Sequence, residues 1–278
     1  MGESMVVSGG GGLRLIELPQ GRTVARTALE GASALCAGGD SVYAASRWGE
    51  VIWRLHAELL VPTGLFAGGP GICRMLLSRS GRQLYALCGE ADSLVMLDAH
   101  SGAPLLLNRV GVGPCAMAMD GEGRRIAVAG GGSGEVIVLS AGSLRVERRL
   151  ATCGMVFGAA IGGAVYAMSL EESMNTAITA FFGEGGQCVR MLPGMPGALA
   201  LCGDSLLAAT HAGLYALDPM TLRVRMSCDV PGRAGRLIPA RSGIVMIDQW
   251  SDGLFLREGG RWRLLCEQAV DAALIRDT

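Results

Sequence analysis

The segment VGVGPCAMAMDGEGRRIAVAGGGSGEVIVLSAGSLRV, residues 110–146, decides the fold, because it holds four short apolar stretches and the turns between them. The stretches begin at Gly113, Ile126, Glu135 and Leu144. Apolar residues in them alternate with period two or follow one another directly, and glycine interrupts the pattern every ~8–12 residues. This periodicity excludes helices and predicts four antiparallel strands joined by tight turns.

The same unit recurs along the whole chain. Its opening stretch begins at Gly31, Gly71, Gly113, Gly154, Pro196, Gly232 and Val270. Successive starts are about 40 residues apart, and the distance from Val270 through the C-terminus and on to Gly31 is also about 40 residues. A β-sandwich would not need a period that closes on itself. Four strands of ~5 residues repeated at this period are typical of the blades of a β-propeller.

The sequence therefore predicts an all-β, seven-bladed β-propeller with four antiparallel strands per blade, as a single domain over residues 1–278. One blade is split between the two ends of the chain. Its innermost strand is expected at Val270–Arg276, and its other three at Ser4–Gly9, Leu13–Leu18 and Thr23–Leu29. Pairing of the C-terminal strand with these N-terminal strands is expected to close the ring.

Residues 110–146 and residues 74–102, RMLLSRSGRQLYALCGEADSLVMLDAHSG, resemble YVTN-type, WD-repeat-like propeller repeats. Such repeats run Gly-x-x-Pro, a short strand, a Gly-Lys/Arg turn, an aliphatic-Tyr-Val strand and an aliphatic pair ending in Asp. Here the Tyr-Val-Thr-Asn core is replaced by YAAS, YALC and YAMS. The resemblance implies the fold. It implies little about activity, because the family spans lactonase-like enzymes, surface proteins and uncharacterised members. It also matches Asp98 and Asp218 to the Asp that ends the third strand, where a short carboxylate caps the following turn.

Composition excludes several classes of function. The net charge of -1 gives no electrostatic footprint for nucleic acid. All 24 basic residues are Arg, which excludes Schiff-base lysine chemistry and a Walker-type phosphate loop. No apolar run approaches the ~18 residues that a membrane span requires. The nine cysteines are scattered and lack CxxC spacing, so we expect reduced thiols and a cytoplasmic protein. No metal and no cofactor is predicted.

The turns between second and third strands, together with the connections between blades, are expected to share one face, here called the top face. It carries many carboxylates and, of basic residues, only Arg47. One sign of charge beside aromatic surface favours a small cationic ligand or a protein partner. The predicted ligand-binding residues are Trp48, Glu50, Glu90, Glu171, His211, Trp250 and Asp252.

These patterns favour a non-enzymatic binding or scaffold protein. No GxSxG or HExxH motif is present, and nothing forms a set of nucleophile, base and orienting group. One alternative is a lactonase-like hydrolase or a lyase acting at the top of the central channel, since His211 and either Glu171 or Glu172 are expected on adjacent blades. A second alternative is a structural protein that acts through oligomerisation.

The fourth strand of each blade is an exposed edge, and most copies are guarded by alternating charges such as Arg145, Glu147 and Arg149. Two neighbouring copies are apolar, namely LLVPTGLF at residues 59–66 and APLLLN at residues 103–108. Apolar outer surface of this kind often marks an interface. The predicted interface for self-association or for a protein partner comprises Leu60, Leu105, Leu106 and Leu107.

Overall fold

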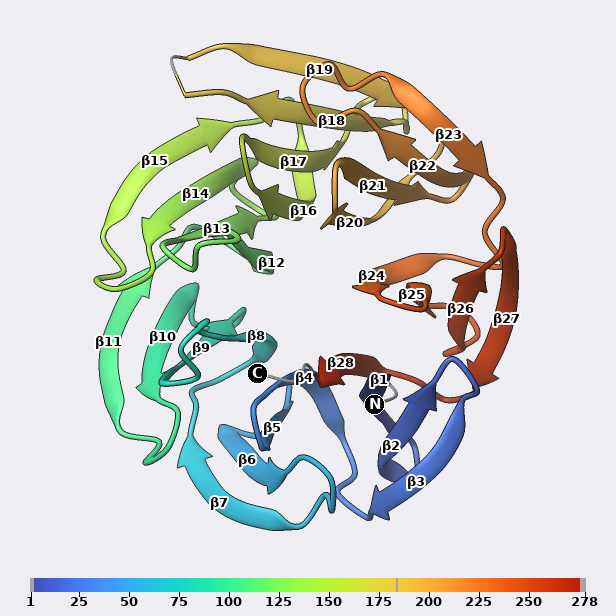
Figure 1. The fold of residues 1–278 in the computed structure, drawn as a ribbon. Coiled ribbons are helices and arrows are strands. Elements are labelled where there is room, and N and C mark those ends of the chain that lie inside the picture. The colour runs from blue at the N-terminus through green and yellow to red at the C-terminus, as the bar shows by residue number, and fades with distance from the viewer. Residues whose placement is uncertain (1–2, 184, 276–278) are drawn as a thin grey trace. The chain divides into compact units, whose positions relative to one another are not determined.

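The computed structural model describes residues 3–183 and 185–275, and Figure 1 shows their arrangement. They form seven four-stranded antiparallel sheets. The predicted fold class, an all-β seven-bladed β-propeller with four strands per blade, is confirmed. Within the described ranges no helix is long and apolar enough to cross a membrane.

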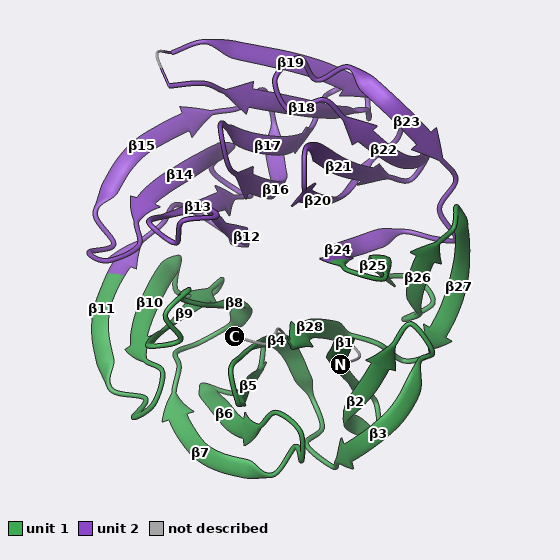
Figure 2. Ribbon diagram, in the orientation of Figure 1, with its two compact units in different colours: residues 1–107, 240–278 green, residues 108–239 purple. Residues whose placement is uncertain are grey.

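The chain divides into two compact units, coloured separately in Figure 2. Unit 1 comprises residues 1–107 and 240–278, and unit 2 comprises residues 108–239. The divisions fall inside strands β11 and β24. That the whole chain is a single domain stays a prediction.

Unit 1 begins with the split blade, which has the strand order β28(Asp271–Ile275), β1(Glu3–Gly9), β2(Gly12–Leu18), β3(Arg22–Thr27). The next blade consists of β4(Ala32–Gly38), β5(Ser41–Ser46), β6(Val51–His56) and β7(Pro62–Ala67). It is followed by β8(Ile72–Leu77), β9(Gln83–Cys88), β10(Ser93–Asp98) and β11(Pro104–Arg109). The unit also holds β25(Gly243–Asp248), β26(Leu254–Glu258) and β27(Arg261–Cys266) of the blade that starts with β24(Ala234–Ala240).

Unit 2 has three further blades. The first consists of β12(Pro114–Met119), β13(Arg125–Gly130), β14(Glu135–Ser140) and β15(Val146–Ala151). The second consists of β16(Met155–Ile161), β17(Val165–Leu170), β18(Thr176–Phe181) and β19(Gln187–Leu192). The third consists of β20(Pro196–Cys202), β21(Ser205–Thr210), β22(Gly213–Leu217) and β23(Val224–Cys228).

The C-terminal strand completes the N-terminal blade, as predicted, except that Arg276 lies outside the described residues. β28 pairs antiparallel with β1, with Val6 opposite Ala273. The buried Asp271 fastens this strand to the next blade, because its Oδ2 accepts a hydrogen bond of 2.7 Å from the Leu35 amide. The first and last strands of the described residues therefore share one sheet.

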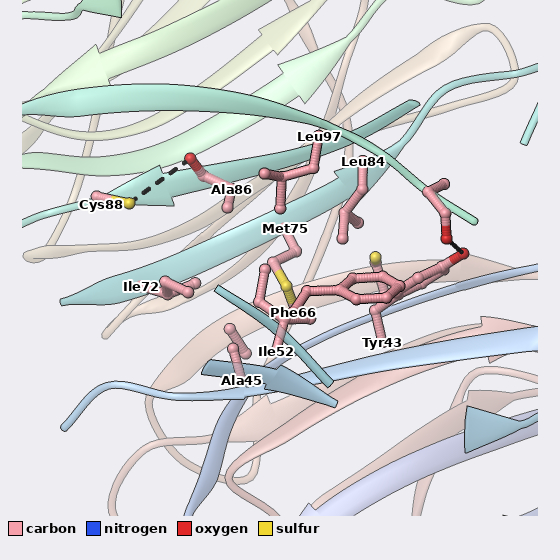
Figure 3. Close-up of a cluster of buried hydrophobic side chains, with 13 residues drawn as sticks. Tyr43, Ala45, Ile52, Phe66, Ile72, Met75, Leu84, Ala86, Cys88 and Leu97 are labelled. Carbon is pink, nitrogen blue, oxygen red and sulfur yellow. Dashed lines mark hydrogen bonds between the residues drawn. The ribbon is translucent and has the colours of Figure 1, made fainter. Parts of the chain in front are cut away.

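The wholly apolar second strands are explained by burial on both faces. In β5, Tyr43 and Ala45 belong to a core cluster shared with β8–β10, whereas Val42 and Ala44 belong to a cluster shared with β2 and β28. Figure 3 shows the first cluster, in which the Tyr43 ring lies 6.3 Å from the ring of Phe66. Alternation persists in β5, but both sets of side chains are apolar because blades cover both faces.

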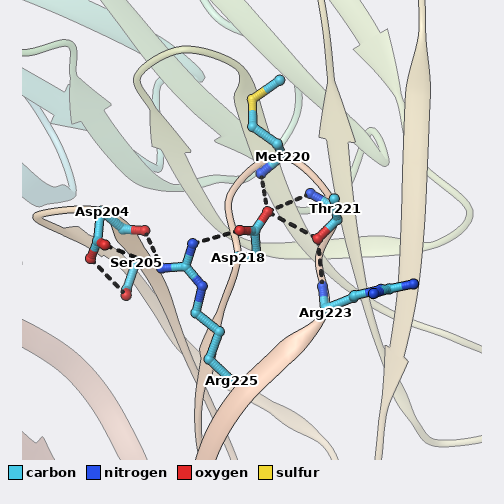
Figure 4. Close-up of polar contacts among 7 residues, drawn as sticks. All are labelled: Asp204, Ser205, Asp218, Met220, Thr221, Arg223 and Arg225. Carbon is cyan, nitrogen blue, oxygen red and sulfur yellow. Dashed lines mark hydrogen bonds and ion pairs between the residues drawn. The ribbon is translucent and has the colours of Figure 1, made fainter.

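The turns after third strands are capped by carboxylates, which confirms the structural role predicted for Asp98 and Asp218. In Figure 4, Oδ1 of Asp218 accepts hydrogen bonds from the Met220 amide and from the amide and hydroxyl of Thr221. Its Oδ2 accepts one from Arg225. Asp98 accepts the corresponding bonds from His100 and Ser101.

Candidate binding surface

The β5–β6 turn of unit 1 holds Trp48 out in solvent. The side chain of Trp48 is 86% exposed. The turn itself is fixed, since the Arg47 amide donates to Ser33 Oγ at 2.8 Å and the Trp48 amide donates to Ser46 Oγ at 3.2 Å. The guanidinium carbon of Arg47 lies 5.8 Å from the centroid of the Trp48 ring. The turn therefore displays a large aromatic ring on a backbone that is already ordered.

Trp250 occupies the β25–β26 turn of the same unit and is 70% exposed. The carboxylate of Asp248, the last residue of β25, is only 2% exposed and orders this turn. It accepts hydrogen bonds from the Trp250 amide at 3.2 Å and from the Ser251 amide and hydroxyl at 3.0 and 2.5 Å. Asp252 has a φ of 51°, and its carbonyl accepts a hydrogen bond from the Ala269 amide. This turn, too, is organised before any ligand arrives.

The N-terminal blade has a β1–β2 turn with no side chains, and the chain before β28 ties this blade to the Trp250 turn. The Ala269 bond ties the Trp250 turn to the blade connection, and the next amide, Val270, donates to Ser8 at the end of β1. The β1–β2 turn that follows is Gly10–Gly11. A Cβ added at Gly11 would meet nothing within 4 Å, so packing does not require glycine there. Bare backbone of this kind lets a ligand approach closely.

Carboxylates surround these turns. Glu50, Glu90 and Asp252 are all exposed, and so are Glu30 and Glu267 on the blade connections. The side chain of Glu90, in the β9–β10 turn, packs against the backbone of Gly71, because a Cβ at Gly71 would lie 2.5 Å from the Glu90 Cγ. Unit 1 thus carries five of the predicted ligand-binding residues on its turns between second and third strands. We call this set the tryptophan surface: Trp48, Glu50, Glu90, Trp250 and Asp252.

The other two predicted residues, Glu171 and His211, belong to unit 2. Glu171 follows β17 and forms a hydrogen bond with the thiol of Cys153, which raises the pKa of that thiol. His211 lies between β21 and β22, where its amide donates to the Met195 carbonyl at 3.1 Å. Burial, and secondly the charge of Arg233, lower the pKa of His211, so its imidazole is neutral at pH 7.

The assignment of Leu60 to an interface is wrong. Leu60 is 1% exposed and packs in the core cluster that contains Leu35 and Leu55. It sits in the β6–β7 turn with a φ of 52°, and its amide donates to the His56 carbonyl. Leu144 and Leu222 have the same conformation and burial in the corresponding turns, so this leucine anchors the turn. Leu105, Leu106 and Leu107, by contrast, are exposed.

Sequence reasoning missed Asp248 as the support of the Trp250 turn. The signal was present, because Asp-x-x-Ser/Thr occurs as DAHS from Asp98, DPMT from Asp218 and DQWS from Asp248.

Sequence reasoning also missed a repeated β-bulge in the innermost strands. The bulge turns the side chain of Ser33 towards the Arg47 amide and that of Cys73 towards the Leu87 carbonyl. Burial raises the pKa of Cys73, which holds it as a thiol.

The comparisons with known proteins agree on the fold. No protein-family model matches the chain, and no curated protein matches it in sequence. A functionally unknown protein from Desulfotomaculum acetoxidans DSM 771 superposes with a TM-score of 0.77 at 10% identity, over 100% of both chains. A Bacteroides uniformis ATCC 8492 protein provisionally assigned as a 6-phosphogluconolactonase gives 0.75 at 11% identity, over 98% of this chain and 99% of that chain.

The Neurospora crassa Pan2 WD40 domain gives a TM-score of 0.62 at 12% identity, over 88% of this chain and 79% of that chain. At such identities the likeness shows the fold alone. The chain therefore has the WD40-like, seven-bladed propeller fold that its YVTN-type repeats implied.

Proposed function

We propose that this protein is a non-enzymatic binding scaffold and that its tryptophan surface binds a cationic group of a ligand or protein partner. The observation that carries the proposal is the pair of tryptophans, 86% and 70% exposed, on turns ordered by hydrogen bonds. Rigid aromatic anchors lose little conformational entropy on binding and dominate the energetics of many interfaces.

The chemistry of the partner follows from the charges. Glu50 and Asp252 flank the two tryptophans in sequence and are exposed. A guanidinium or ammonium over an indole ring gains ~0.5–2 kcal/mol, and the chain's own Arg47 guanidinium already lies 5.8 Å from the centroid of the Trp48 ring. Carboxylates beside the rings would steer and hold the same cation. We therefore expect an arginine-rich or lysine-rich segment as partner.

Fluorescence anisotropy with a labelled octa-arginine peptide tests the proposal, with an octa-glutamate peptide as the matched probe. The double variant Trp48→Ala/Trp250→Ala should weaken binding roughly 5–30-fold, the equivalent of about 1–2 kcal/mol. Met220→Ala, at an exposed turn residue of unit 2, is the control and should leave the affinity unchanged. If octa-arginine does not bind to wild type, or binds both proteins equally, the tryptophan surface is not a cation-binding site.

A second candidate function, a hydrolase or lyase, is favoured by the neutral imidazole of His211, which can act as a general base. Glu171, on the preceding blade of unit 2, would be its acidic partner. Assays of lactone hydrolysis and of elimination, with His211→Ala as the inactive control, test this candidate. Activity that His211→Ala abolishes would establish a catalytic site in unit 2 and contradict the proposal that the protein is non-enzymatic.

A reducing compartment, the cytoplasm, is part of the proposal. All nine cysteines lie in the described residues and each is a thiol. Thiols persist in that compartment, whereas secreted proteins usually pair them. Localisation of a tagged full-length chain would test this.

A further inference from the structure

The outer strand β11 carries leucines where its counterpart β15 carries charges. The two strands align through the turns before them, in which the Asp98 amide donates to Ala103 and the Ser140 amide donates to Arg145. Leu105, Leu106 and Leu107 therefore correspond to Glu147, Arg148 and Arg149. Three leucines replace three charged residues at equivalent edge positions.

All three leucines are in contact with solvent. They are 46%, 40% and 66% exposed, so side chains on both faces of β11 are uncovered. β11 is also the terminal strand of its sheet, and an edge strand presents unpaired backbone N–H and C=O groups. Apolar side chains and free hydrogen-bonding groups occur here on one short segment.

Exposed apolar side chains also occur on the neighbouring blade of unit 1. Gly102, just before β11, lies against Phe66 of β7, since a Cβ there would be 2.2 Å from the Phe66 ring. Leu59, Val61 and Leu65, in and beside β7, are 62%, 54% and 55% exposed. Two neighbouring outer strands therefore expose several large apolar side chains, which often marks an interface.

Charge decides what this edge can accept. β3, β15, β19, β23 and β27 each carry arginine, so pairing one of them with its own copy would bring like charges together. β7 is uncharged too, but Gly64 at its centre weakens the strand and has no side chain to pack. β11 also contains a proline and an arginine, but Pro104 and Arg109 lie at its two ends, and the segment Leu105–Leu107 between them has no charge and no glycine. β11 is thus the outer strand suited to a second copy of itself.

We propose that β11 pairs antiparallel with β11 of a second copy, across a two-fold axis at Leu106. Residues that pair across such an axis point to the same side of the sheet, whereas neighbours in one strand point to opposite sides. The axis must therefore lie between the two copies of one residue. Centring it on Leu106 places Leu106 opposite itself and Leu105 opposite Leu107, so that leucine meets leucine throughout. Two blades then form one continuous sheet, and the leucines of the two copies contact each other across the junction.

Sedimentation velocity of the full chain between ~1 and ~100 µM tests the association. Wild type should dimerise, and Leu106→Arg should raise the dissociation constant at least about tenfold by placing two like charges opposite each other. Met226→Arg is the matched control, because Met226 has the equivalent place in β23, is 43% exposed, and should leave the dimer intact. A monomeric wild type, a dimeric Leu106→Arg protein, or equal loss in the control would overturn the proposal.

Cysteine cross-linking tests the register, in a Cys153→Ser background that removes the exposed native thiol. Directly opposite residues have Cβ atoms close enough for a disulfide. Leu106→Cys should therefore cross-link with itself. Leu105→Cys should cross-link only when mixed with Leu107→Cys. Self-cross-linking of Leu105→Cys as efficient as that of Leu106→Cys would show that the axis is elsewhere. Thermal melts and octa-arginine binding by each variant report folding and the tryptophan surface separately.

Discussion

The hydroxyl of Tyr43 should contribute measurably to the stability of the core between two blades of unit 1. Tyr43 is 2% exposed, and its hydroxyl donates to the Ala99 carbonyl at 2.8 Å, which ties β5 to the turn after β10. Tyr43→Phe keeps the ring beside Phe66 and removes only this bond. Burial raises the pKa of Tyr43, so the phenol stays protonated, and the effect should be the same between pH 6 and about 9.

The size of the effect follows from what the substitution leaves behind. A net hydrogen bond contributes about 0.5–1.5 kcal/mol, and a buried carbonyl left without a partner costs about 1–3 kcal/mol. Ala99 is only 1% exposed, so water reaches its carbonyl poorly. We expect the free energy of unfolding to fall by about 1–2 kcal/mol and the Tm by roughly 2–6 °C. Urea unfolding followed by circular dichroism measures the first, and calorimetry measures the second.

Tyr85→Phe is the matched control. The Tyr85 hydroxyl donates to Gln83 Oε1 at 3.2 Å, and Gln83 is half-exposed, so its oxygen can turn to water when the phenol is removed. The loss should stay below about 1 kcal/mol. If Tyr43→Phe destabilises the protein no more than Tyr85→Phe does, the bond to Ala99 is not a stabilising tie between the blades.

Three further predictions use other parts of the molecule. Hydrogen bonds, first from the Thr221 amide and then from Arg225, lower the pKa of Asp218 to about 2, below the ordinary value of 3.8. Its stabilisation should be complete above about pH 4 and disappear as the pH falls through about 2, so Asp218→Asn should flatten that part of the stability–pH curve. Leu60→Ala should lower the free energy of unfolding by about 2–4 kcal/mol, measured in urea, and leave the sedimentation coefficient unchanged, because Leu60 is core rather than interface. Glu171→Gln should speed alkylation of Cys153 by iodoacetamide at pH 7.5, because a neutral amide accepts the thiol hydrogen bond more weakly and has no negative charge to raise the thiol pKa; an unchanged rate would show that Glu171 does not raise this pKa.

The sequence by itself determined the strands, their number and the split blade. These depend on local patterns that repeat, and each copy confirms the others: the stretch at Val270 is recognisable because six others resemble it. The pairing of β28 with β1 follows from the number of strands per blade, because the three N-terminal strands need a fourth strand to complete a blade. The capping role of Asp98 follows from a short-range pattern as well, and the same pattern would have identified Asp248.

Exposure was decided only by the tertiary structure, because it depends on which distant segments cover a side chain. Leu60 and Leu106 both stand in apolar runs near an outer strand. A positive φ at Leu60 directs its side chain into the core, whereas the side chain of Leu106 stays 40% exposed. Trp48 and Trp250 could equally have packed over neighbouring blades, and the hydrogen bonds of Ser33 and Asp248 hold their turns outward instead. A single sequence gives the residues of a turn, but the direction in which the turn points depends on contacts with residues outside it.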